Sequence, residues 1–107
     1  MWGIMKSSKF VDHADDAAAL LSLLANGKRL MIVEQLLDQE MSVGAIAEKV
    51  ELSQSALSQH LAKLRSLKLV ETRRDRQMIY YSCKSDAARR LLGTLEDIFV
   101  NGTGRGH

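Results

Sequence analysis

The 107-residue sequence predicts a mainly α-helical domain with one small β-hairpin, and three observations carry that prediction. Apolar residues recur at steps of three and four along most of the chain, which is the spacing of helices with one buried face. Proline, which breaks helices, is absent. Between residues 69 and 82 the pattern changes to runs of β-branched and aromatic residues, which are typical of strands.

The composition indicates a folded protein of a reducing compartment. Hydrophobic residues make up 46% of the chain and charged residues 26%, which is the balance of a globular domain. No apolar run is long enough to span a bilayer, and the first ten residues lack the apolar core of a signal peptide. The single cysteine, Cys83, excludes an intramolecular disulfide. We therefore expect a cytoplasmic domain whose small core is marginal without a partner chain.

The first quarter of the chain is expected to hold an arm and a helix. Residues 1–11 show no period and are expected to form a flexible arm. Asp12 is a candidate cap for the first helix, because its carboxylate can accept from a free amide of the first turn. Asn26 is expected to end this helix and to cap a second one over 28–38.

Two further helices are separated by a tight turn. Ser42 is expected to cap a short helix over 43–50, and a longer helix follows over 53–67. A helix, a tight turn and a second helix form a helix-turn-helix. Glycine often takes the left-handed conformation that such a turn needs. Here Glu51 or Leu52 must take it, at a cost of about 1 kcal/mol.

The helix over 53–67 has two contrasting faces. Ser53 is a suitable cap, and Leu57, Leu61 and Leu64 form an apolar stripe at helical spacing. The opposite face is rich in hydrogen-bonding groups and becomes basic toward its end; it holds Ser55, Ser58, Gln59, Ala62, Lys63 and Ser66. This helix contains no acidic residue, whereas an ordinary solvated face mixes Glu with Lys. The outer face is therefore suited to close contact with a polyanion.

The segment behind this helix is expected to form a hairpin. β-Branched and aromatic residues fill 69–74 and 77–82, and Asp75 and Arg76 between them are expected to form the turn. A hairpin with a basic tip, directly behind a helix-turn-helix, is a wing. The predicted fold is therefore a winged helix-turn-helix.

Positive charge is concentrated in the centre of the chain. Residues 1–52 hold five Lys or Arg against eight Asp or Glu, a net charge of −3. Residues 53–84 hold seven against two, a net charge of +5; the seven are Lys63, Arg65, Lys68, Arg73, Arg74, Arg76 and Lys84. A basic block of this kind is typical of a nucleic-acid site.

Ser85 or Asp86 is expected to cap a last helix, which completes a domain over 12–100 and precedes a disordered Gly-rich tail at 101–107. So short a chain cannot hide every apolar face inside itself. We expect the first and last helices to meet their copies across a two-fold axis, and the alternative is that both faces belong to the core of one chain. The candidate interface residues are Leu20, Leu21, Leu24, Leu91, Leu95, Ile98 and Phe99.

Four segments together resemble the ArsR/SmtB family of dimeric winged-helix repressors. They are ANGKRL at 25–30, MSVGAIA at 41–47, LSQSALSQHL at 52–61 and TRRDRQMIYYS at 72–82, in the order and spacing of the family, and the resemblance covers about residues 15–100. Gly27 departs from the family, which usually has proline there, and Arg76 stands where glycine is common. The resemblance implies a bacterial, nucleoid-associated homodimer that binds a partly palindromic operator on double-stranded DNA and blocks transcription.

In that arrangement, two recognition helices enter successive major grooves about 34 Å apart. Glutamine can pair with adenine and serine can serve several base edges. The candidate base readers are therefore Gln54, Ser55, Ser58 and Gln59. The candidate contacts to phosphate or, for the wing arginines, the minor groove are Ser53, His60, Lys63, Arg65, Arg73, Arg74 and Arg76. For His60, packing against the hairpin is an equal alternative.

The sequence predicts no metal site and no cofactor. The family's thiolate site needs cysteines between residues 41 and 47, and its zinc-type site on the last helix needs a histidine at position 88, which is alanine. A dithiol switch needs two cysteines, so Cys83 is expected to be a packing residue. No inducer is indicated. No catalytic pattern predicts an enzyme. The remaining alternatives are a winged helix that binds protein, which the basic block disfavours, and a transcriptional activator.

Overall fold

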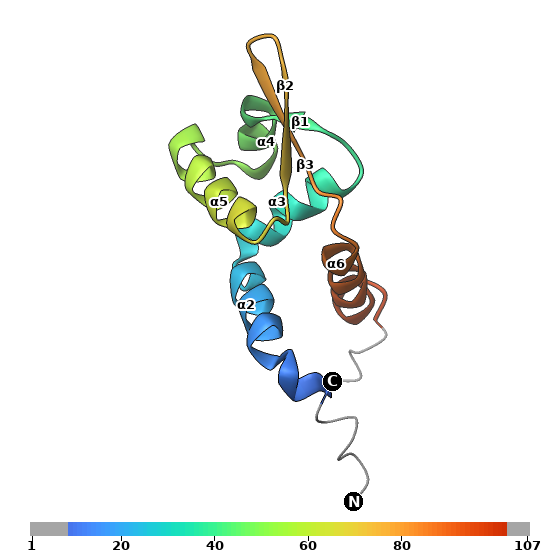
Figure 1. Cartoon of the computed structure of the whole chain (residues 1–107). Coiled ribbons are helices and arrows are strands. Elements are labelled where there is room, and N and C mark those ends of the chain that lie inside the picture. Colours follow the sequence, from blue (N-terminus) through green and yellow to red (C-terminus); the bar gives the residue numbers. More distant parts are fainter. Residues whose placement is uncertain (1–8, 103–107) are drawn as a thin grey trace, which may run out of the picture.

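The computed structural model describes residues 9–102 and shows a winged helix-turn-helix (Figure 1). Most of the expected arm and most of the expected tail lie outside the described residues. The elements, in chain order, are α2 (Ala14–Leu24), α3 (Gly27–Leu37), β1 (Met41–Ser42), α4 (Val43–Val50), α5 (Gln54–Ser66), β2 (Glu71–Asp75), β3 (Met78–Ser82) and α6 (Asp86–Phe99). The hairpin projects at one end of the molecule, and α2 and α6 extend away from it at the other end (Figure 1). None of the helices between residues 9 and 102 is long and apolar enough to cross a membrane.

Four helices begin at the capping residues that the sequence indicates. The side chains of Asn26, Ser42, Ser53 and Ser85 each accept a hydrogen bond from the amide three residues ahead. The start of α2 differs, and the cap expected at Asp12 is wrong. Residues 9–12 are already helical, so Asp12 cannot take the extended conformation of a cap, and His13 precedes α2 without a side-chain bond.

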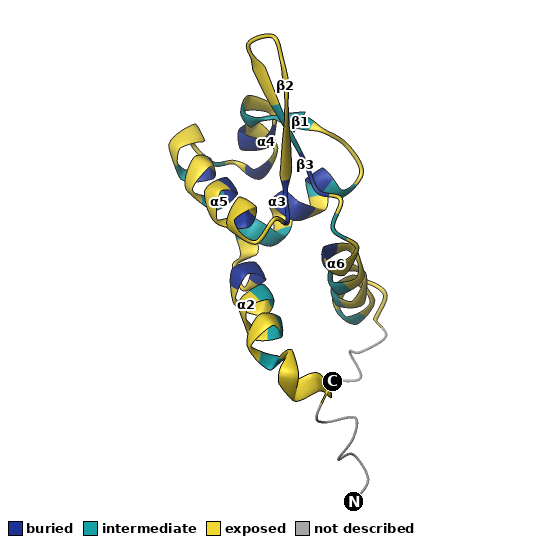
Figure 2. Ribbon diagram, viewed as in Figure 1, coloured by how far each residue is buried: buried dark blue, intermediate teal, exposed yellow. Residues whose placement is uncertain are grey.

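The core lies where α3, α4 and α5 meet (Figure 2). The expected apolar stripe of α5, which consists of Leu57, Leu61 and Leu64, is 0–1% exposed. It packs in one cluster with residues of α3 and α4, of which Ile32 and Ile46 are fully buried. Apolar burial on three helices therefore fixes α5 from behind and leaves its opposite face in solvent.

The hairpin belongs to a three-stranded antiparallel sheet with strand order β1-β3-β2. Its third strand precedes α4, where the sequence indicated no strand: Met41 and Ser42 pair with Tyr81 and Tyr80. The expected turn is also one residue too early. Asp75 pairs with Met78, so Arg76 and Gln77 form the two-residue loop.

The turn between α4 and α5 contains the expected left-handed residue. Glu51 has φ 58° and ψ 54°, a conformation that costs a non-glycine residue on the order of 1–2 kcal/mol. The backbone amides of Glu51 and Leu52 both donate to the carbonyl of Ala47, which closes the end of α4. The tight turn thus places the start of α5 directly beyond α4.

Candidate nucleic-acid interface

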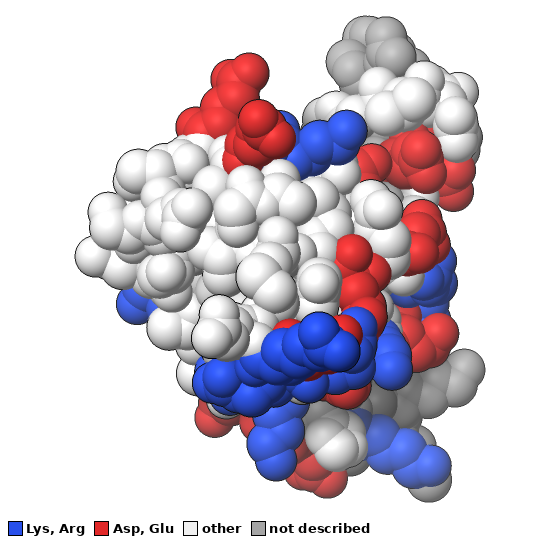
Figure 3. Space-filling view, turned by 90° about the horizontal axis from the view of Figure 1, so that it is seen from above, with Lys and Arg blue, Asp and Glu red and all other residues white. Residues whose placement is uncertain are grey.

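The outer face of α5 is polar and exposed. Gln54, Ser55, Ser58 and Gln59 are all exposed, and no acidic residue lies on this helix. Seen from the hairpin end, the surface shows a broad area without charged residues beside a band of Lys and Arg (Figure 3). Short side chains that donate and accept hydrogen bonds, on a helix held from behind, can reach base edges in a major groove.

Ser53 is exposed, but its hydroxyl is engaged at the start of α5. The Oγ atom accepts from the amide of Ala56 at 3.2 Å and lies 3.3 Å from the Oγ of Ser55. This bond satisfies one of the amides that a helix leaves free at its first turn. The other amides at the start of a helix have no acceptor within the helix, and a helix N-terminus favours an anion such as phosphate.

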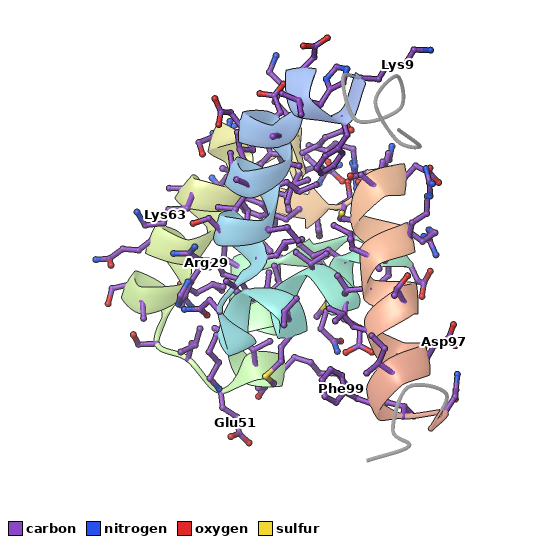
Figure 4. All side chains as sticks on the ribbon, turned by 90° about the horizontal axis from the view of Figure 1, so that it is seen from below. Lys9, Arg29, Glu51, Lys63, Asp97 and Phe99 are labelled. Atoms are coloured by element: carbon purple, nitrogen blue, oxygen red, sulfur yellow. The ribbon has the colours of Figure 1, made fainter. Side chains whose placement is uncertain are left out.

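Cations flank the polar face on two elements. Lys63 and Arg65 are exposed in the last turns of α5, and Lys63 points away from the body of the molecule (Figure 4). On the hairpin, Arg74 is exposed in β2 opposite Ile79, and Arg76 is exposed in the loop with φ 60°. These four side chains are free of intramolecular salt bridges among the residues that the structure describes.

Arg73 differs from the other expected wing contacts because it has an acidic partner. Its Nε donates to both carboxylate oxygens of Glu40 at 3.1 and 3.0 Å, and its Nη2 donates to Oε1 at 2.9 Å. The guanidinium also lies over the ring of Tyr80, 5.0 Å from its centroid. The hydrogen bond from Arg73 lowers the pKa of Glu40, and the same bond raises the pKa of Arg73. Arg73 is therefore not the free wing-tip cation that the sequence predicted, because Glu40 cancels its charge locally.

His60 is half-buried, and its partner lies on α3 rather than on the hairpin. The Nδ1 atom accepts from Nε of Arg29 at 3.1 Å. Burial lowers the pKa of His60, and the positive charges of Arg29 and Lys63 lower it further. A neutral imidazole that already accepts a hydrogen bond can contact DNA only through its other nitrogen.

The candidate dimer residues fall into three groups. Leu21 of α2 is 57% exposed and Phe99 of α6 is 66% exposed. The next group is half-buried and consists of Leu20, Leu91, Leu95 and Ile98. Leu24 is only 5% exposed within one chain and belongs to the core cluster. Its place in the expected interface is therefore corrected, because the junction between α2 and α3 folds it inward.

Cys83 is buried and lies in no cluster of candidate metal ligands among the described residues. The Cys83 side chain is 2% exposed, and burial raises the pKa of its thiol, which makes it a poor nucleophile. Between residues 9 and 102, no group of three or more His, Cys, Asp or Glu side chains could hold a metal ion.

Sequence reasoning missed three residues that shape this surface. They are Glu40, which pairs with Arg73, and Lys28 and Arg29, which contact α4 and α5. Glu40 and Arg73 are 33 residues apart, and no sequence period connects them. For Lys28 and Arg29 a signal existed: cations in the first turn of a helix oppose its dipole, so partners elsewhere should compensate them.

A helix-turn-helix with an exposed, acid-free second helix and a basic wing defines a DNA-binding transcription regulator. Comparison with known proteins agrees. Residues 26–72 match the family model described as bacterial regulatory protein, arsR family. The chain belongs to the ArsR family.

The relatives of this chain include proteins named as activators and proteins named as repressors of transcription. Over 92 residues, which cover 86% of this chain and 75% of the relative, it is 58% identical to nodulation protein NolR of Rhizobium meliloti. It is 45% identical to the transcriptional activator HlyU of Vibrio cholerae, with coverage of 89% and 88%. It is 41% identical to a biofilm growth-associated repressor of Agrobacterium fabrum, with coverage of 81% and 74%.

Solved structures show the same fold. NolR from Sinorhizobium fredii matches with a TM-score of 0.80 and 55% identity, over 85% of this chain and 91% of that one. A homodimeric winged helix-turn-helix DNA-binding domain from Mycobacterium bovis matches with a TM-score of 0.71 and 32% identity, over 82% of each chain.

Proposed function

We propose that this chain represses transcription as a homodimer on a partly palindromic DNA operator. One observation carries the proposal: the outer face of α5 is exposed, hydrogen-bonding and free of acid, and unpaired cations flank it on α5 and on the hairpin. Protein-binding surfaces are enriched in aromatic residues and methionine and depleted in serine, whereas this face carries two glutamines and two serines. As a bacterial DNA-binding regulator, the protein would act in the cytoplasm at the nucleoid.

The proposed roles follow from position and chemistry. Base edges would be read by Gln54, Ser55, Ser58 and Gln59. Phosphates would be held by the first turn of α5 behind Ser53 and by His60, Lys63, Arg65, Arg74 and Arg76. Arg73 would contribute less, because Glu40 holds its guanidinium. Bidentate pairing of glutamine with adenine discriminates among bases, whereas contacts to phosphate do not.

The homodimer is supported by the exposed apolar side chains at the end opposite the hairpin. Leu21 and Phe99 would cost free energy in water, and a copy of the chain can cover both. The proposed interface consists of Leu20, Leu21, Leu91, Leu95, Ile98 and Phe99. A two-fold axis there would present two copies of α5 to one face of the duplex. The homodimeric relative from Mycobacterium bovis has the same fold.

The test is binding of purified protein to duplex from its own promoter and to a scrambled duplex, across a salt series, by fluorescence anisotropy. We expect tight binding to the promoter that weakens steeply with salt, a palindromic footprint and a dimeric mass in light scattering. Equal, weak binding to both duplexes would overturn the proposal. Transcription in vitro from the same promoter then distinguishes a repressor from an activator. We expect the protein to reduce transcription; an increase would instead favour an activator, as in the name of HlyU.

A further inference from the structure

The first turn of α3 carries two adjacent cations that the proposed DNA contacts do not use. Lys28 and Arg29 follow the cap Asn26, at the end of the helix where the dipole disfavours positive charge. Both side chains leave α3 and reach the negative ends of two other helices. This compensates the unfavourable position and joins the three helices.

Lys28 contacts the end of α4. Its Nζ donates to the backbone carbonyl of Val50 at 2.6 Å, and Val50 is the last residue of that helix. The last carbonyls of a helix have no partner within it, and a cation there complements the dipole. Glu51, in its left-handed conformation, follows directly, so Lys28 holds the helix-turn-helix at its corner.

Arg29 contacts α2 and α5 at once. Its Nη1 donates to the carbonyl of Leu23 in the last turn of α2 at 3.1 Å, and its Nε donates to Nδ1 of His60 at 3.1 Å. Figure 4 shows Arg29 between α3 and α5. The planar guanidinium can serve both acceptors together because its donors point in fixed directions.

The hydrogen bonds of Lys28 and Arg29 add directional constraints to the apolar packing of the helices. The stripe of Leu57, Leu61 and Leu64 holds α5 against the core, but the hydrophobic effect that drives this burial is non-directional. The hydrogen bond from Arg29 is directional, and His60 lies next to the proposed base reader Gln59. A shift of about 1 Å is enough to weaken bidentate readout of a base.

We propose that Arg29, assisted by Lys28, is a positioning residue for DNA recognition, which sets the placement of α5 relative to α2, α3 and α4 and thereby the discrimination between target and random DNA. This inference rests on the proposed function of α5. Since α2 also belongs to the proposed dimer interface, Arg29 links the placement of each recognition helix to the two-fold axis.

The experiment compares the Kd for a duplex selected by the wild-type protein from a random pool with the Kd for a scrambled duplex. Arg29→Lys keeps the charge but lacks the planar fork, and Arg29→Met keeps the apolar stem and loses every donor. Arg89 provides the matched control, because it bonds the carbonyl of Leu37 and the carboxylate of Asp38 away from α5. Arg89→Met should keep the wild-type ratio of the two Kd values.

We expect the ratio to fall about tenfold in Arg29→Met, as for loss of one charge-assisted hydrogen bond, with an intermediate fall in Arg29→Lys. Random-DNA affinity of Arg29→Lys should stay within about twofold of wild type, since the charge is kept. Circular dichroism at the assay temperature verifies that each variant is folded. If Arg29→Met is folded and keeps the wild-type ratio, the positioning role of Arg29 is refuted but the proposed function stands. If the wild-type protein binds both duplexes equally, both the positioning role and the proposed function are refuted.

The pH dependence of the Kd ratio distinguishes the proposed positioning role from a purely structural role, which would not change with the protonation of His60. Protonated His60 cannot accept from Arg29, and the charged groups that face it are Arg29 from α3 and Lys63 from α5. Because the pKa of His60 is lowered in the folded chain, the wild-type ratio should hold near the ordinary histidine pKa of about 6.5 and fall only at lower pH, where the folded protein protonates His60. The ratio of Arg29→Met should not change over the same range. Parallel pH profiles for the two proteins would overturn the inference.

Discussion

Helices α5 and α6 begin with the same kind of cap but differ in how much of their apolar stripe is buried. They have 13 and 14 residues, and each begins at a serine whose hydroxyl accepts from the amide three residues ahead. Yet α5 buries three leucines at 0–1% exposure, whereas α6 buries only Ala88 and leaves Phe99 66% exposed. The comparison teaches that two similar helices can treat their apolar stripes differently: the stripe of α5 is buried and holds a polar face in solvent, whereas much of the stripe of α6 is left uncovered within one chain, where we propose that a second copy binds.

The largest effect should come from the buried stripe of α5. Leu61→Ala should lower the free energy of unfolding by about 2–5 kcal/mol, because it removes buried methyl groups and leaves a cavity in the core. Urea denaturation followed by circular dichroism measures this. Leu95→Ala on α6 should cost less, and its cost should grow with protein concentration if the side chain is buried only in the dimer. Equal costs for both variants, independent of concentration, would break the comparison.

The next effect concerns the apolar end of the molecule. Leu21→Glu should raise the dissociation constant of the dimer at least about tenfold, since an unpaired charge would be buried between the chains. Met78→Glu, which changes an exposed apolar residue of the hairpin, is the control and should remain dimeric. Light scattering over a dilution series separates the two outcomes. A stable dimer in Leu21→Glu would move the interface away from α2.

Two variants of the proposed DNA surface test whether α5 reads bases while the hairpin contacts phosphates. Gln59→Ala should cost about 1–3 kcal/mol on the target duplex and little on random DNA, because it removes a proposed base contact. Arg74→Ala should weaken binding to every sequence similarly and flatten the salt dependence, because it removes a proposed phosphate contact. Anisotropy titrations on both duplexes provide the measurement. Equal losses on both duplexes in both variants would contradict this division.

The two serine caps should be equivalent in the free protein. Ser53→Ala and Ser85→Ala should each lower the free energy of unfolding by about 1 kcal/mol, since each leaves a first-turn amide without its acceptor. Only Ser53→Ala should also weaken DNA binding, because only α5 lies at the proposed interface. Thermal unfolding and DNA titration of the same samples test this. A similar loss of DNA affinity in Ser85→Ala would show that caps act through stability alone.

The smallest effect is a pH dependence of stability from His60. Its pKa is lowered in the folded chain, chiefly by burial, so the unfolded chain binds more protons below about pH 6.5. This contribution to stability is complete above that pH and is lost as the pH falls toward the folded pKa. Unfolding midpoints of wild type and His60→Gln between pH 5 and 7.5 measure it. The wild type should lose more stability on acidification, and an identical pH slope in both proteins would exclude His60 as the source.

The sequence predicted those parts of the fold that depend on local chemistry. The leucine stripe of α5 and the caps Asn26, Ser42 and Ser53 follow from periodicity and from capping rules, and Ser85 and the left-handed Glu51 were each one of two candidates. The two-residue strand β1 was missed because Met41 and Ser42 are too few to show a period. The hairpin loop was placed one residue early because Asp75, a common turn residue, pairs with Met78.

The parts of the site that the sequence did not predict depend on contacts between distant residues. Arg29 and His60 are 31 residues apart, and Glu40 and Arg73 are 33 apart. A count of charges along the sequence includes Arg73 as a free cation, because such a count does not show that the fold places the carboxylate of Glu40 beside it. In the same way, the spacing of Leu24 fits either face of α2 until the direction of α3 is known, and the fold turns it into the core.

The short strand β1 limits how this chain can vary in length. Ser42 pairs with Tyr80 of the wing and also caps α4 through Ala45, while Glu40, just before the strand, holds Arg73. An inserted residue within 40–42 would turn the side chains to the opposite face of the sheet or move the cap of α4 out of reach. In this connection, an insertion or deletion should therefore be tolerated better at the exposed Gln39 than within residues 40–42, where the wing and the helix-turn-helix share their contacts.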